Sequence, residues 1–235
     1  MDKITIVMAY YENGGMLDIH FKEWETYPKK YKPCFEAIIV DDGSQKDPAI
    51  NHFPDDLPFP VSLYRINEDI PWNQNGARNL AMTNADGWCL LTDMDHLLPV
   101  DQVSTLIKMR KEYGSFYRPL RKRAVDSLSY KQHPNTYVLH RDLYWQAGGF
   151  DEAYAGYYGT DSTFRKRLIS TGQKVECDSL TLTLYGREVI ADASTTNYGR
   201  KGSEYHVSQN LELAERKKLC PDPIQPLNFS WWKVR

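Results

Sequence analysis

The chain has 235 residues, of which 41% are hydrophobic and 26% are charged, and its formal net charge at pH 7 is −2. This composition is typical of a folded protein with a sizeable core. A net charge so close to zero excludes a global electrostatic attraction to nucleic acid or to anionic lipid.

The cysteines and the first residues bear on the compartment. None of the four cysteines belongs to a CxxC pair, which argues against a zinc site or a disulfide framework and favours reduced thiols in the cytosol. The chain does not open on a basic segment followed by a long apolar one, and no apolar run reaches about 18 residues. We therefore expect a cytoplasmic protein without a transmembrane segment.

Strand and helix patterns alternate through the first hundred residues. Short apolar runs rich in β-branched residues predict strands at 4–9, 37–40, 61–66 and 88–92. Apolar residues at helical spacing predict helices at 16–31 and 75–85. This alternation predicts an α/β fold with a mostly parallel sheet flanked by helices. Ligands of such sheets bind beyond the carboxyl ends of the strands.

The remaining residues have a less regular pattern. It predicts helices at 101–113, 161–170 and 205–219, and strands at 115–119 and 136–140. The chain contains no internal repeat and no linker-like segment. We therefore expect one domain over residues 1–235, made of a first half (1–100) and a second half (101–235).

Two aspartates end the strand predicted at 88–92. In an extended segment Asp93 and Asp95 point to the same side, where like charges repel unless a cation or hydroxyl donors lie between them. Mg²⁺ and Mn²⁺ prefer such oxygen ligands and commonly bind phosphate oxygens as well. The alternative is a solvated loop whose carboxylates cap the next helix, and a lone D-x-D does not decide between the two.

Two further motifs place polar groups near the same edge of the predicted sheet. In VDDGS, Asp41 and Asp42 follow the strand at 37–40 and could accept hydrogen bonds from a base or a ribose, with Gly43 allowing a sharp turn. A plain Asp-Gly turn is the alternative. In GARNLA, Arg78 lies near a helix start, where a guanidinium could bind a pyrophosphate or simply face solvent.

The order of these motifs resembles that of GT-A glycosyltransferases of the large family-2 group. That resemblance implies a Rossmann-like GT-A sheet with a smaller acceptor-side lobe, in which residues 1–100 bind a nucleotide-sugar donor, with UDP-sugars as the leading candidates. Residues 101–235 would form the acceptor and catalytic half. The roles implied for single residues are Ala9 and Tyr10 in the base pocket, Asp41 or Asp42 on the base or ribose, Arg78 near the diphosphate, Asp93 near the ribose, and Asp95 on a Mn²⁺ or Mg²⁺ ion.

Residues 147–168, AGGFDEAYAGYYGTDSTFRKRL, resemble the acceptor-side segment of galactosyltransferases and related GT-A enzymes. The resemblance implies that Asp161 is the general base and that His206 completes the metal shell. It also implies that the acceptor contacts lie in the loop Tyr157, Tyr158 and Gly159. Thr160 departs from the glutamate usual in this segment. An N-cap aspartate and a polar helix histidine are the alternatives for Asp161 and His206.

The motifs together predict a metal-dependent, inverting glycosyltransferase that moves a sugar to an acceptor hydroxyl. A retaining GalNAc-transferase-like enzyme and a non-catalytic nucleotide-sugar-binding protein are the alternatives. A nucleotidyltransferase is disfavoured, because the N-terminal AYYENGG contains no Lys or Arg for phosphate. We expect the acceptor to be a glycan, a lipid-linked sugar or a modified nucleic acid, and the sequence does not decide among them. The basic run at 118–123 could bind an anionic acceptor or be solvated, and the polar loop 194–203 could close over the donor.

Overall fold

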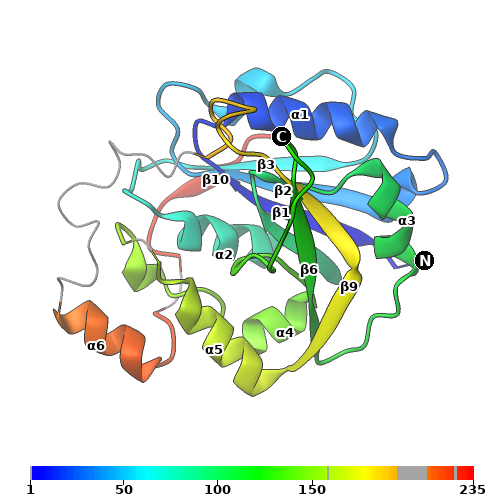
Figure 1. Cartoon of the computed structure of the whole chain (residues 1–235). Helices are drawn as coiled ribbons and strands as arrows, with labels where there is room; N and C mark the ends of the chain where they lie inside the picture. Colours follow the sequence, from blue (N-terminus) through cyan, green and yellow to red (C-terminus); the bar gives the residue numbers. More distant parts are fainter. Residues whose placement is uncertain (1, 158, 195–210, 225–226) are drawn as a thin grey trace.

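Figure 1 shows the computed structural model, which describes residues 2–157, 159–194, 211–224 and 227–235. Its ten strands form one mixed sheet in the order β10-β3-β2-β1-β4-β8-β6-β9-β5, and β7 pairs with β6. The strands are β1 (Ile4–Tyr10), β2 (Phe35–Asp41), β3 (Val61–Ile66), β4 (Trp88–Asp93), β5 (His96–Leu97), β6 (Ser115–Arg123), β7 (Ser129–Tyr130), β8 (Tyr137–His140), β9 (Gln173–Leu184) and β10 (Trp231–Lys233). The helices are α1 (Gly14–Thr26), α2 (Gln74–Asn84), α3 (Val100–Lys108), α4 (Arg141–Gln146), α5 (Asp161–Thr171) and α6 (Leu211–Leu219), with short 3₁₀ turns η1 (Lys32–Cys34), η2 (Ala49–His52) and η3 (Glu152–Tyr154).

The centre of the sheet is parallel, with β3, β2, β1 and β4 side by side. Tyr10 of β1 lies beside Asp41 of β2, and Ala9 lies beside Asp93 of β4. Three strands therefore end level with one another, so that the loops that follow them meet at one crevice. Strand β8 pairs antiparallel with both β4 and β6, which continues the sheet into the second half of the chain.

Helices cover both faces of this sheet, as Figure 1 shows: α1 and α3 lie on one face, and α2, α4 and α5 lie on the other. On the first face, Trp24 of α1 and Leu106 of α3 belong to one buried hydrophobic cluster. On the second face, Leu80, Tyr144 and Phe164 belong to another. Burying apolar residues on both faces is the main stabilising contribution in this architecture. The expected α/β fold with a mostly parallel, helix-flanked sheet is confirmed.

Two predicted helices end earlier than expected. Helix α1 ends at Thr26, not at residue 31, because Pro28 disfavours the helical conformation of the residue before it. Helix α3 ends at Lys108, not at residue 113, and the amine of Lys111 folds back to donate to the carbonyls of Leu106, Ile107 and Met109. A cation that binds the last carbonyls is a common helix stop.

The structure also contains strands that the sequence analysis did not predict. Strand β9 pairs with β6, and the short β10 adds an antiparallel edge to β3. Strand β6 continues to Arg123, so the basic run at 118–123 lies within a strand. Of the helix predicted at 205–219, the structure describes α6, and residues 205–210 lie outside the described residues. No helix in the described part of the chain is both long enough and apolar enough to cross a membrane.

Candidate active site

A pocket opens at the carboxyl ends of β1 and β4, where the register brings the acidic motifs together. Its lining includes six of the residues singled out in the sequence: Ala9, Tyr10, Asp42, Asp93, Asp95 and Asp161. These residues come from three strand ends and from the first turn of α5. The pocket thus joins the donor-side motifs of the first half to the acidic helix start of the second half.

The two aspartates of VDDGS have different surroundings. Asp41 is only 1% exposed, and its carboxylate accepts hydrogen bonds from the backbone of Ser44 (2.8 Å) and Ala49 (2.9 Å) and from Arg65 (2.8 Å). That carboxylate therefore holds its own loop in place. Asp42 lines the pocket, with the amide of Asn73 3.3 Å from its Oδ1. Of the two, Asp42 is the residue placed to meet a ligand.

Arg78 of α2 is buried behind the pocket, with 1% of its surface exposed. Its guanidinium forms an ion pair with Asp93 and donates to Gln74 at 3.1 Å. Burial alone raises the pKa of Asp93, but the charge and hydrogen bond of Arg78, together with smaller contributions from His133 and His96, hold that pKa well below its usual range. Asp93 therefore remains ionised. In the structure, Arg78 acts on the pocket through Asp93 and is not itself part of the lining.

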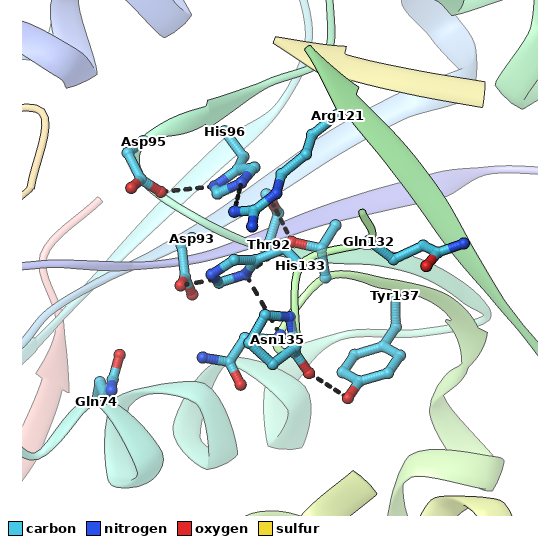
Figure 2. A network of polar contacts seen from close by, with 12 residues as sticks. Gln74, Thr92, Asp93, Asp95, His96, Arg121, Gln132, His133, Asn135 and Tyr137 are labelled. Atoms are coloured by element: carbon cyan, nitrogen blue, oxygen red, sulfur yellow. Dashed lines mark hydrogen bonds and ion pairs between the residues drawn. The ribbon is translucent and has the colours of Figure 1, made fainter. Parts of the chain in front are cut away.

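His133 lies beside the other oxygen of Asp93, with Nδ1 3.6 Å from Oδ2 (Figure 2). The same nitrogen accepts from the backbone N–H of Asn135 at 3.3 Å, so it carries no proton. Burial lowers the pKa of His133 to about 4, against smaller opposing contributions from Asp93 and Asp95. The ring is therefore neutral near pH 7, and Arg78 is the cation that balances Asp93.

Asp95 is held by a different partner from Asp93, the neighbouring His96, as Figure 2 shows. Its Oδ1 lies 2.6 Å from Nδ1 of His96, and Nε2 of His96 lies 3.3 Å from a guanidinium nitrogen of Arg121. His96 is 1% exposed, whereas the side chain of Asp95 is 22% exposed and faces the pocket. The two carboxylates of the D-x-D motif thus reach the same pocket from independent anchors.

The carboxylate oxygens of Asp93 and Asp95 are suitable ligands for a small divalent cation. Two carboxylates supply hard oxygen ligands, and Oδ1 is the only oxygen of Asp95 for which the described residues provide a partner. The described residues contain no group of three or more His, Cys, Asp or Glu side chains able to hold a metal ion. Further ligands would therefore come from phosphate oxygens and water. The predicted ligand His206 lies outside the described residues.

Asp161 lies in the first turn of α5 and lines the pocket. Burial raises the pKa of Asp161, and the positive charges of Arg78 and Lys217 and a hydrogen bond from Asn135 oppose that rise. The helix dipole also favours the ionised form at this position. In its ionised form, a carboxylate with a raised pKa is a stronger base than a free aspartate.

None of the described residues in the loop 157–160, which precedes Asp161, lines the pocket. Tyr157 and Gly159 are half-buried and do not contribute to the lining formed by the described residues, and Tyr158 lies outside those residues. Thr160 is 4% exposed, and its carbonyl accepts from the hydroxyl of Thr163 at 2.9 Å. At the glutamate position of the motif, this chain therefore has a buried threonine whose backbone carbonyl, and not its side chain, makes this contact at the start of α5.

Most of the basic run at 118–123 is engaged within the protein. Arg118 donates to the carbonyls of Gln132 and His133, and Arg121 donates to Lys131 and His96. Arg123 pairs with Asp126 and Glu188. These contacts hold the 129–135 segment against β6 and leave Lys122 as the member of the run without such a role. Three of the four basic side chains of the run therefore already use guanidinium N–H groups within the protein.

Several pocket residues were not singled out in the sequence. They are Tyr11, Asn13, Trp72, Gln74, Met94, His133, Pro134, Asn135, Ala193 and Ser194. Trp72 has a left-handed backbone, with φ +52°, which is uncommon for a bulky residue and is found at binding sites. In the sequence, the indication for Trp72 is that an aromatic residue stands between a predicted strand and the GARN helix. The predicted lid at 194–203 begins at Ser194, and its remaining residues lie outside the described part.

A scan against protein-family models finds no match for this chain, and neither does a search of curated proteins. Solved structures do match. TarS 1–349 of S. aureus in complex with UDP-GlcNAc is 11% identical, with a TM-score of 0.65 over 93% of this chain and 66% of that one. The mannosyltransferase PcManGT of Pyrobaculum calidifontis, in complex with GDP-Man and Mn²⁺, is 17% identical, with a TM-score of 0.58 over 77% of this chain and 56% of that one.

GalNAc-T7 with UDP, GalNAc and Mn²⁺ is 13% identical, with a TM-score of 0.63 over 91% of this chain and 48% of that one. The chain thus spans between 48% and 66% of the length of these three structures. At such identities the likeness establishes the fold, and it confirms the GT-A fold expected from the sequence.

Proposed function

From the GT-A fold and the pocket, we propose that this protein transfers a sugar from a nucleotide diphosphate sugar, with UDP-sugars as the first candidates, to an acceptor hydroxyl with inversion. One observation carries the proposal: Asp42, Asp93 and Asp95 line the same pocket as Asp161. A site that only bound a nucleotide would have no use for a carboxylate placed as a base.

The nucleoside end of the donor belongs at Ala9, Tyr10 and Asp42. Tyr10 is fully buried and donates its hydroxyl to the carbonyl of Asp47 at 2.6 Å, so this hydroxyl is already engaged within the protein. The Asp42 carboxylate supplies an acceptor for a base N–H or a ribose hydroxyl. Trp72 adds an aromatic surface on which a base can stack.

The diphosphate end belongs at the D-x-D motif. Asp95 and Asp93 would hold the divalent cation, which when bound neutralises charge on the leaving nucleotide diphosphate. Arg78 contributes by keeping Asp93 ionised and oriented, as their buried ion pair indicates. In this role Arg78 acts near the diphosphate, as the family resemblance implies, but through Asp93.

Asp161 then accepts the proton of the acceptor hydroxyl as its oxygen attacks the anomeric carbon. The C–O bond to the acceptor forms as the bond to the nucleotide diphosphate breaks on the opposite side of the sugar. Asn135 lines the pocket beside Asp161 and hydrogen-bonds to its carboxylate, which orients it. We further propose that residues 1–100 supply the donor side, and residues 101–235 the acceptor side, of one catalytic domain.

A panel of UDP-, GDP-, dTDP- and CMP-sugars, tested by thermal shift with Mn²⁺ and with EDTA, examines the donor site. We expect one nucleotide class to stabilise the wild-type protein only with the cation. Asp95→Ala should lose this metal-dependent stabilisation. Equal nucleotide affinity with Mn²⁺ and with chelator would refute the metal assignment.

The base is tested with the donor found in that screen. Asp161→Asn keeps the side-chain volume, so it should bind the donor normally while transfer falls by about 10²- to 10⁴-fold. Near-normal transfer by this variant would remove Asp161 from the mechanism. The anomeric configuration of the product, read by NMR, separates inversion from retention, and absence of turnover with normal donor binding would favour a non-catalytic binding protein.

A further inference from the structure

The two carboxylates of the D-x-D motif are held by different partners, and the partner of Asp95 is an imidazole. His96 follows Asp95 directly in the chain, yet its ring is 1% exposed and lies between the carboxylate and the guanidinium of Arg121 (Figure 2). The Asp95 Oδ1 to His96 Nδ1 distance is 2.6 Å, and the His96 Nε2 to Arg121 Nη1 distance is 3.3 Å.

Arg121 decides which ring nitrogen of His96 carries the proton. A guanidinium has only N–H donors, so the Nε2 atom that faces it must accept and is therefore unprotonated. The ring proton then lies on Nδ1, where it donates to Oδ1 of Asp95. With the opposite tautomer, two donors would meet at Nε2 and two acceptors would meet at Asp95.

The His96 ring is fixed by its surroundings and not by Asp95 alone. The backbone of His96 pairs with Leu184 of β9, and its ring packs on that of His133 with centroids 4.4 Å apart. Arg121 is itself anchored, because its Nε donates to the carbonyl of Lys131 at 2.9 Å. The orientation of Asp95 is thus set from strands β5 and β6, at a distance from the pocket.

We propose that His96 is a positioning residue for the metal site: oriented by Arg121, it occupies Oδ1 of Asp95 and leaves Oδ2 as the single oxygen offered to the cation. This inference rests on the proposed function, in which Asp95 is a metal ligand. A carboxylate that offers one oxygen suits the small six-coordinate ions Mn²⁺ and Mg²⁺ better than Ca²⁺, which commonly takes bidentate carboxylates.

Two substitutions at one position separate the hydrogen bond from side-chain packing. In His96→Asn the amide nitrogen stands one bond beyond Cγ, as Nδ1 does, so it can still donate to Asp95. In His96→Gln the amide lies one bond farther out, closer to the place of Nε2. Mn²⁺ affinity is measured by EPR titration in the presence of UDP, and UDP affinity is measured separately in EDTA.

We expect His96→Asn to stay within about threefold of the wild-type Mn²⁺ affinity and His96→Gln to bind Mn²⁺ about 10- to 100-fold more weakly. Both variants should keep the wild-type UDP affinity in EDTA, and the preference for Mn²⁺ over Ca²⁺ should shrink in His96→Gln. Wild-type Mn²⁺ affinity in folded His96→Gln, or equal losses in both variants, would overturn the inference.

Arg121→Met provides a second test that leaves His96 in place. Nitrogen-15 NMR of histidine should show the Nδ1–H tautomer in the wild-type protein and a population of the Nε2–H tautomer in the variant, with weaker Mn²⁺ binding. An unchanged tautomer and unchanged affinity would overturn the inference even if His96→Gln failed to fold.

Asp95→Ala distinguishes failure of this inference from failure of the proposed function. If Asp95→Ala abolishes Mn²⁺ binding while His96→Gln and Arg121→Met leave it intact, the positioning role alone is wrong. If the wild-type protein and Asp95→Ala bind Mn²⁺ equally, the metal assignment fails, and the positioning role fails with it.

Discussion

The side-chain amide of Asn79 satisfies both backbone groups of Phe150: Nδ2 donates to the carbonyl at 2.9 Å, and Oδ1 accepts from the N–H at 3.0 Å. The same amide donates to Glu152 at 2.7 Å and accepts from the hydroxyl of Tyr144. Asn79 is the asparagine of the GARN motif, and Phe150 lies 71 residues away in the GGFDE turn. One buried amide therefore joins the donor-side helix to the turn that leads to Asp161.

We expect Asn79→Ala to lower the free energy of unfolding by about 2–4 kcal/mol, because the change leaves several buried polar groups without partners. Urea unfolding followed by circular dichroism measures the loss. Asn84→Ala is a matched control on the same helix, since Asn84 makes one hydrogen bond, to the carbonyl of Leu80. The control should lose less than about 1 kcal/mol. Equal losses would show that helix propensity, and not the link to Phe150, dominates.

The sequence was sufficient to predict the core of the fold and the acidic pocket. Strands such as β1 and β4 are runs of buried apolar residues, and a run of this kind is a local signal. The parallel alignment of β2, β1 and β4 then brings Asp42 and Asp93 to one crevice by a general rule of α/β sheets. The sequence pattern does not predict strand β9 although its end alternates as LTLTL, because five of its first eight residues are polar or charged.

The sequence does not predict the roles of residues that depend on burial in the folded protein. The VDDGS sequence does not show that Asp41 turns inward to its own loop while Asp42 faces the pocket, because this depends on the fold of the loop and on Arg65 of β3. The sequence leaves open whether Arg78 binds a pyrophosphate or faces solvent, whereas the structure shows it buried and paired with Asp93. His133 and Asn135 reach the pocket only because β6 anchors the loop that carries them.

Asp93 and Asp95 should respond differently to removal of their carboxylates. Asp93→Ala leaves the buried Arg78 without its counter-charge, so it should cost about 3–5 kcal/mol of stability. Asp95→Ala removes a side chain that is 22% exposed and has a neutral partner, so it should cost about 1 kcal/mol or less. Denaturant unfolding in EDTA compares the two variants. A smaller loss for Asp93→Ala would show that the ion pair with Arg78 is not needed for folding.

His20 should make stability depend on pH in the mildly acidic range. Its ring is buried, with Nε2 2.8 Å from the carbonyl of Met94, and burial lowers its pKa from 6.5 to about 4. Between these values the unfolded chain binds a proton that the native protein does not, so stability should fall as pH drops from about 6.5 toward 4. His20→Gln should reduce that slope by about 1.4 kcal/mol per pH unit.

His52 provides a control of opposite sign. Burial alone lowers the pKa of His52, but its hydrogen bonds with Asp47 and Asp18 outweigh burial and raise it. The stability that His52 contributes is present below the pKa of the unfolded chain and is lost as pH rises through the raised value. His52→Gln should therefore change the profile on the alkaline side of 6.5 and leave the acidic slope intact. An acidic slope unchanged by His20→Gln would contradict the assignment.

Lys217 should lower the pKa of Asp161, the proposed general base. Its amine donates to the carbonyl of Gly159, and its charge helps to lower the pKa of Asp161 against the larger effect of burial, which raises that pKa. Because Asp161 accepts a proton only when ionised, the transfer rate should fall as pH drops through this raised pKa. Lys217→Met removes the nearby positive charge, so the acidic limb of kcat/KM should move to higher pH.

Lys218→Met is the matched control, because that side chain is 75% exposed and pairs with Glu215. An acidic limb at the same pH in both variants and in the wild-type protein would show that Lys217 does not act on Asp161.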